Sequence, residues 1–153
     1  MNKEYKTITL SEEDSVGILR LNRPEKLNAF NMQMLDDMIS AIDFVDANDN
    51  IKALILTGNG KAFCAGADLS SGDKTFDKEF DTSGIFESNF RRDAGGILSL
   101  KIFNSLKPVI AACNGDAVGV GATMQLAADI RIANKKARFG FVFAKRGIVP
   151  DGC

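Results

Sequence analysis

Residues 62–69 read AFCAGADL, and residues 114–123 read NGDAVGVGAT. Each segment follows an apolar, β-branched run and precedes a stretch with the pattern of a helix. A glycine-bearing turn between a strand and a helix presents backbone N–H groups. Two such turns that face each other predict a pocket with two donors for a carbonyl oxygen that gains negative charge.

The rest of the chain alternates between strand and helix patterns. Apolar runs predict strands at 16–21, 51–57, 109–113 and 129–133, with a fifth at 138–141. Helical spacing predicts helices at 31–45, with Asn31 as N-cap, at 96–106 and at 124–128. Residues 70–89, rich in Ser, Gly, Asp and Lys, predict a loop. The alternation predicts an α/β fold with a largely parallel sheet, and its recurrence favours a spiral of ββα units.

Length and composition place the chain among ordinary globular proteins. With 153 residues, 45% of them hydrophobic and 25% charged, residues 1–153 are expected to form a single domain. The formal net charge of -1 gives no electrostatic reason to expect nucleic-acid or membrane binding. The N-terminal residues lack the apolar core of a signal peptide and no stretch reaches membrane-spanning length, so we expect a cytoplasmic protein.

The cysteine and histidine counts exclude several kinds of chemistry. The chain has 3 cysteines without CxxC spacing and no histidine. We therefore expect no metal site, no disulfide framework and neither a Cys–His pair nor a Ser–His–Asp triad. The absence of histidine also disfavours a self-compartmentalising serine protease. Gly119 and Gly121 begin a dinucleotide fingerprint, but Met124 stands where the third glycine belongs, which disfavours a dehydrogenase.

Five motifs in order carry a resemblance to a known family. They are the runs at 22–30, at 63–69, at 107–123 with its glycine turn, at 129–133 and at 137–140. Together they resemble the crotonase superfamily, the enoyl-CoA hydratase/isomerase family, from about Val16 to the last residue. The resemblance implies the crotonase-like α/β spiral and chemistry on an acyl-CoA thioester. Coenzyme A would then be part of the substrate rather than a permanently bound cofactor.

The resemblance also implies roles for individual residues. The backbone N–H groups of Ala67 and Val120 would form an oxyanion hole for the thioester carbonyl; Val120 replaces a more usual glycine and is expected to narrow the pocket. Lys26 would offer its charge to a phosphate, with Arg23 as a weaker candidate. The implied coenzyme A contacts are Lys26, Leu27, Ala65, Ala67, Asp68, Leu69, Val120 and Thr123.

The acid–base residues separate the possible reactions. Family hydratases hold a water between two glutamates, and here Thr123 and Phe143 stand at those positions. Neither side chain is a general base at neutral pH. Asp151 matches the position at which double-bond isomerases of the family carry a catalytic carboxylate. The leading expectation is therefore enoyl-CoA isomerisation with Asp151 as the proton shuttle.

Two alternatives stay open. The first is a hydratase with unusual acid placement that uses Asp151, and Thr123 with water. The second is a non-catalytic acyl-CoA-binding or assembly protein. Family members continue well beyond Cys153 into C-terminal helices that cap the site and build a homotrimer or hexamer. The chain is therefore expected to be a core truncated at its C-terminus, lacking that helical region.

Overall fold

The computed structural model describes residues 4–70, 93–147, 149 and 152. The strands are β1 (Ile8–Glu13), β2 (Val16–Leu21), β3 (Ala53–Gly58), β4 (Ala62–Cys64), β5 (Val109–Cys113), β6 (Asp116–Val118), β7 (Ile130–Ala133) and β8 (Phe139–Gly140). The α-helices are α1 (Met32–Ala47), α2 (Ala94–Phe103) and α3 (Val120–Met124), and short 3-10 turns span Pro24–Lys26, Gln125–Ala127 and Ala144–Arg146. The loop predicted at 70–89 lies, apart from Ser70, outside these residues.

The strands form two sheets that are wound together. One sheet has the order β1-β2-β3-β5-β7, in which β1 and β2 are antiparallel and the later pairs are parallel. The other has the order β4-β6-β8 and is parallel throughout. From β3 onward, each unit gives one strand to the first sheet and the next strand to the second, and the helix α2 follows β4 while α3 follows β6. The predicted α/β spiral is confirmed.

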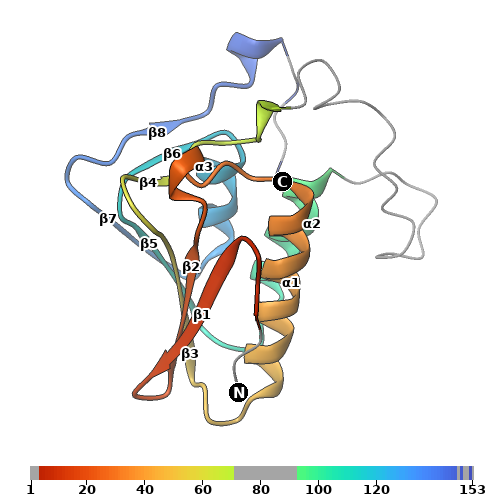
Figure 1. The fold of residues 1–153 in the computed structure, drawn as a ribbon, viewed down its shortest axis with the longest axis vertical. Helices are drawn as coiled ribbons and strands as arrows, with labels where there is room; N and C mark the ends of the chain where they lie inside the picture. Colours follow the sequence, from red (N-terminus) through yellow and green to blue (C-terminus); the bar gives the residue numbers. More distant parts are fainter. Residues whose placement is uncertain (1–3, 71–92, 148, 150–151, 153) are drawn as a thin grey trace.

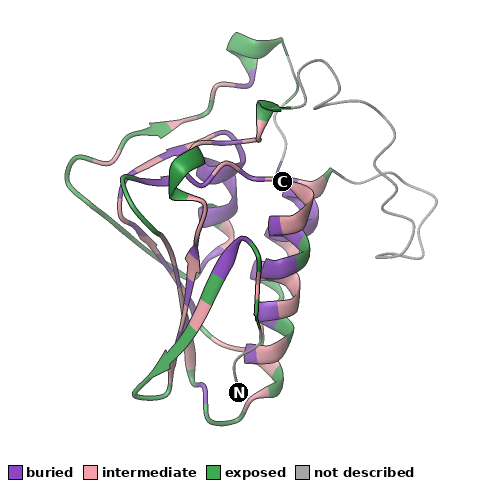
Figure 2. Cartoon of the chain, in the orientation of Figure 1, coloured by how far each residue is buried: buried purple, intermediate pink, exposed green. Residues whose placement is uncertain are grey.

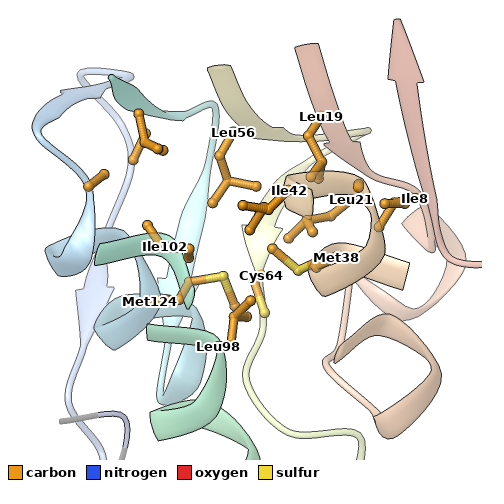
Figure 3. Close-up of a cluster of buried hydrophobic side chains, with 14 of the residues drawn as sticks. Ile8, Leu19, Leu21, Met38, Ile42, Leu56, Cys64, Leu98, Ile102 and Met124 are labelled. Atoms are coloured by element: carbon orange, nitrogen blue, oxygen red, sulfur yellow. The ribbon is translucent and has the colours of Figure 1, made fainter. Parts of the chain in front are cut away.

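The core lies between the five-stranded sheet and the helices α1 and α2, which pack on one of its faces (Figure 1). Buried residues line the inner side of this layer, whereas the outer side of the helices is exposed (Figure 2). Figure 3 shows Leu19 and Leu56 of the sheet near Ile42 of α1, and Cys64 near Met124. Cys64 therefore joins the end of β4 to the same core that holds α3.

The predicted start of the first long helix is confirmed at atomic detail. The Asn31 side-chain oxygen accepts a hydrogen bond from the Met34 N–H at 2.9 Å. An N-cap of this kind satisfies one of the backbone donors that the first helical turn leaves unpaired. The face of α1 that packs on the sheet carries the apolar residues Leu35, Met38 and Ile42, all buried.

Several element boundaries differ from the sequence predictions. The strands β1, β4 and β6 were not predicted, because β1 has charged and polar residues on its exposed positions and the other two contain only 3 residues each. The third helix begins at Val120 rather than at Met124. Its first turn includes Gly121, which lies against Cys64 at a position where a Cβ would collide with the Cys64 backbone. The helix α2 ends at Phe103 and does not continue to 106.

In the part of the chain that the structure describes, no helix is both long enough and apolar enough to cross a membrane.

Candidate active site

The first glycine turn joins β4 to the residues that follow it, and it is held against the segment before α1. Gly66 has a φ of 101°, a left-handed conformation that glycine adopts without strain. The Gly66 carbonyl accepts from the Phe30 N–H at 2.8 Å, and the Asp68 N–H donates to the Phe30 carbonyl at 2.8 Å. This is a parallel bridge between Phe30 and Ala67. In such a bridge the N–H and C=O of Ala67 itself point away from Phe30.

The second glycine turn joins β6 to α3. Gly119 has a φ of 54°, and its N–H donates to the Gly140 carbonyl at 2.8 Å. The Gly119 carbonyl accepts from the N–H groups of Ala122 and Thr123, at 2.8 Å and 3.0 Å. These two bonds form the first turn of α3, and Val120 is its first residue.

The two turns lie in direct backbone contact. A Cβ added to Gly66 would lie 3.1 Å from the Val118 carbonyl oxygen, and one added to Gly119 would lie 3.8 Å from the Gly66 Cα. A Cβ at Gly121 would collide with the carbonyl oxygen of Cys64. The predicted approach of the two glycine turns is therefore confirmed. It depends on glycine at these positions, because a side chain there would meet the backbone of the other turn.

Each turn carries a backbone N–H group for which the described residues offer no acceptor, that of Ala67 on the first turn and that of Val120 on the second. Val120 is buried and Ala67 is partly buried. Unpaired N–H groups are costly in a buried setting, so two on adjacent turns are suited to an oxygen acceptor from a bound molecule.

A nearly buried ion pair holds the first turn. Asp68 Oδ2 lies 2.6 Å from an Arg23 guanidinium nitrogen, and the two side chains are only 12% and 13% exposed. The Asp68 carboxylate also accepts from the Ser70 N–H at 3.0 Å and from the Ser70 hydroxyl. The hydrogen bond from the Ser70 hydroxyl and that from Arg23 hold the pKa of Asp68 well below its usual range. The carboxylate is therefore ionised at any pH near neutrality.

Several of the residues predicted to contact coenzyme A lie at or beside the first turn. The exposed Lys26 Nζ lies 2.6 Å from Ser70 Oγ and 3.8 Å from Asp68 Oδ2. The carbonyl of Leu27 accepts from the Ala65 N–H at 3.0 Å, which places these two backbones together. The side chains of Leu27 and Leu69 are 48% and 46% exposed. Lys26 thus keeps a charge at the surface, beside two exposed apolar side chains.

Arg23, the weaker of the two predicted phosphate contacts, has two hydrogen-bond partners within the protein. Its guanidinium donates to Asp68 and to the carbonyl oxygen of Ala29. Both partners are partly buried, and the two contacts tie Arg23 into the framework of the first turn.

Two asparagines support the turns, and sequence reasoning assigned no role to either. The Asn28 side chain is fully buried, accepts from the Arg23 N–H at 2.9 Å and donates to the carbonyls of Asn59 and Ala62, each at 2.9 Å. The Asn114 side chain accepts from the Gly58 N–H at 2.9 Å. The only sequence signal was their position directly after an apolar run or a proline turn.

The positions of the missing glutamates are filled by packed side chains. Thr123 is buried, and its hydroxyl donates to the Val120 carbonyl at 3.3 Å. Phe143 is also buried. Asp151 lies outside the described residues. Its neighbour Gly152 is buried against Thr123, so closely that a Cβ at this glycine would collide with the Thr123 side chain.

The two described cysteines are structural. Burial raises the pKa of Cys64 and that of Cys113 to about 11, so both are neutral thiols at physiological pH. Among the described residues, no group of three or more His, Cys, Asp or Glu side chains is arranged to hold a metal ion.

The α/β spiral and its paired glycine turns define a class of proteins, the crotonase-like fold. A family model described as enoyl-CoA hydratase/isomerase matches residues 11–153. The chain belongs to the enoyl-CoA hydratase/isomerase family.

Individual relatives agree with this assignment. The chain is 44% identical over 140 residues to the enoyl-CoA hydratase AFT3-1 of Alternaria alternata, covering 92% of the chain and 45% of that relative. It is 40% identical over 152 residues to a short-chain-enoyl-CoA hydratase of Clostridium acetobutylicum, covering 96% of the chain and 54% of the relative. It is 39% identical over 147 residues to the 1,2-epoxyphenylacetyl-CoA isomerase of Escherichia coli K12, covering 91% and 52%.

A solved structure gives the same result. The crystal structure of an enoyl-CoA hydratase subunit from Geobacillus kaustophilus superposes with a TM-score of 0.82 at 31% identity. The match covers 98% of this chain and 55% of that one. The chain therefore spans about half the length of the relatives that it matches.

Proposed function

We propose that the protein to which this chain belongs acts on an enoyl-CoA thioester, and that the N–H groups of Ala67 and Val120 bind the thioester oxygen. The observation that supports this proposal is the pair of N–H groups, without an acceptor in the described part of the chain, on two turns in backbone contact. When a base removes a proton from a carbon conjugated with the thioester, the electron pair moves to the carbonyl oxygen and forms an enolate. Two fixed donors stabilise that charge by about 3 kcal/mol each.

The proposed reaction is migration of the double bond, with the Asp151 carboxylate as proton shuttle. One carboxylate takes a proton from the substrate and returns the proton two carbons further along, so no water is consumed. The buried contact between Gly152 and Thr123 supports this assignment, because Thr123 is three residues after Val120 in α3. The relative named as an isomerase also fits this reaction, although its substrate carries an epoxide.

Hydration is the second candidate, and the relatives named as hydratases favour it. It would require Asp151 and a water positioned by Thr123, because the two usual glutamate positions hold Thr123 and Phe143. A non-catalytic acyl-CoA-binding protein is the third candidate.

In each case Lys26 is proposed to contact the coenzyme A phosphates. Leu27, Ala65, Asp68 and Leu69 are proposed to line the nucleotide side of the binding site. The proposed assembly is a homotrimer or hexamer, in the cytoplasm.

The test uses the full-length protein with a 2-enoyl-CoA and a 3-enoyl-CoA. Isomerisation predicts interconversion of the two without incorporation of solvent oxygen, whereas hydration of the 2-enoyl-CoA gives a 3-hydroxyacyl-CoA.

Two variants test the proposed residues. Asp151→Asn should abolish turnover while coenzyme A still binds. Ala67→Pro removes one donor and should also abolish turnover. Normal activity of a correctly folded Ala67→Pro variant would contradict the oxyanion assignment, and coenzyme A binding without turnover in the wild type would favour the binding protein.

A further inference from the structure

A continuous series of hydrogen bonds leads from the Arg23 guanidinium to the Ala67 N–H. One guanidinium nitrogen donates to the Ala29 carbonyl. That carbonyl shares a peptide unit with the N–H of Phe30, which donates to the Gly66 carbonyl at 2.8 Å. The Gly66 carbonyl in turn shares a peptide unit with the N–H of Ala67. In a planar trans peptide the C=O and N–H point in opposite directions, so each hydrogen bond aims the next donor.

This series starts at a charged guanidinium that is nearly buried and paired with the Asp68 carboxylate. The Arg23 side chain is only 13% exposed. Hydrogen bonds in such a series polarise one another, and a charged donor at one end strengthens the donors that follow. We propose that Arg23 acts through these two peptide units as a positioning residue, which aims the Ala67 N–H and strengthens it as a donor to the thioester oxygen. The proposal rests on the function proposed for Ala67.

The Asp68 carboxylate holds the guanidinium in the orientation that this requires. It accepts from one arm of the Arg23 fork at 2.6 Å, and this leaves another arm directed at the Ala29 carbonyl. The Asp68 N–H also donates to the Phe30 carbonyl, which closes the other side of the bridge around Ala67. A lysine at position 23 has a single ammonium group and cannot reproduce the planar fork.

The second donor provides an internal comparison. The peptide unit that carries the Val120 N–H has the Gly119 carbonyl at its other end, and the donors to that carbonyl are the neutral N–H groups of Ala122 and Thr123. No charged side chain of the described residues takes part. Loss of Arg23 should therefore weaken the donor at Ala67 and leave the donor at Val120 unchanged.

The first measurement requires no substrate. In the full-length protein labelled with 15N-alanine and 15N-valine, Arg23→Gln should move the Ala67 amide proton upfield and leave that of Val120 in place. The double variant R23Q/D68N should give the same shift without a lone buried carboxylate, and Arg23→Lys should give a smaller one. Arg138→Gln is the matched control, because it breaks the exposed pair of Arg138 with Asp116. An Ala67 amide that keeps its position in folded R23Q and in R23Q/D68N would overturn the proposal.

The second measurement compares an enoyl-CoA with the corresponding enoyl-pantetheine, which lacks the nucleotide and its phosphates. Arg23→Gln should lower kcat about tenfold on both substrates, because it weakens a donor that acts in the transition state. A rise in KM confined to the CoA substrate, with kcat unchanged, would instead make Arg23 a phosphate ligand and overturn the proposal. If the wild-type protein converts no enoyl-CoA, the proposed function fails, and the amide shift alone decides the role of Arg23.

Discussion

The two glycine turns present the same group, a backbone N–H with no acceptor among the described residues, but they are held in place by different means. The Ala67 turn depends on side chains that are distant in sequence, since Arg23 reaches Asp68 across 45 positions. The Val120 turn depends on local helix bonds and on a glycine that lies against Cys64. The first turn should therefore be sensitive to charge and pH, and the second to added volume.

The largest effect should come from adding volume at the second turn. Gly121→Ala places a methyl group against the Cys64 carbonyl and 2.7 Å from the Cys64 Cβ. Because both of these atoms belong to Cys64, which is buried in the core, we expect a loss of about 3 kcal/mol in the free energy of unfolding. Urea unfolding followed by circular dichroism measures this loss.

The matched control is Gly140→Ala, at which the nearest atoms are methyl groups of Val118 and Val142 at 3.5 Å. This variant should unfold within about 1 kcal/mol of the wild type. Equal stability of the two variants would show that the contact between the turns can relax and that the second turn is not especially sensitive to added volume.

An intermediate effect should come from acidification, which acts on the first turn. The folded-state pKa of Asp68 is lowered by Ser70 and Arg23, so its contribution to stability is present above the unfolded pKa of about 4 and is lost as the pH falls below it. Between pH 6 and pH 3 the wild type should lose about 1 kcal/mol more than R23Q/D68N. Unfolding free energies measured at both pH values for the two proteins check this, and parallel pH profiles would contradict it.

The smallest effect concerns the thiols behind the turns. Since burial raises the pKa of both Cys64 and Cys113 to about 11, neither should react with iodoacetamide at pH 8 in the native protein. In R23Q/D68N the rate at Cys64 should rise severalfold while Cys113 stays protected, because only the first turn is loosened. Peptide mass spectrometry after timed alkylation separates the two sites. Equal rates at both cysteines would mean that the turns open together.

The sequence predicted the elements whose signal is local. The continuous apolar runs of β3 and β5 and the helical period of α1 were sufficient, as was the glycine pattern of the two turns. The strand β1 was missed because its exposed residues break the apolar pattern at the edge of the sheet. The start of α3 was missed because glycines normally argue against a helix, and its position is fixed by a contact with β4.

In the candidate site, too, only locally encoded features could be predicted from the sequence. The roles of the Ala67 and Val120 N–H groups stay a prediction that the family resemblance implies from the two glycine motifs, and it could be made because backbone groups do not depend on side-chain identity. The partnership of Arg23 with Ala29 and Asp68 could not be predicted, because no periodicity joins the end of β2 to the residues after β4. A charged residue beside a proline has the pattern of a surface cation, and only the packing of the two segments takes it out of water.

The order of the strands has a consequence for synthesis on the ribosome. In the sheet β1-β2-β3-β5-β7 each new strand is added beside the one most recently placed, and no strand inserts between two that are already paired. The second sheet, β4-β6-β8, grows in the same direction. A chain that emerges from its N-terminus can therefore wind one unit onto the next without undoing earlier pairing. The Ala67 turn would meet its Arg23 partner before the residues of the Val120 turn have been translated.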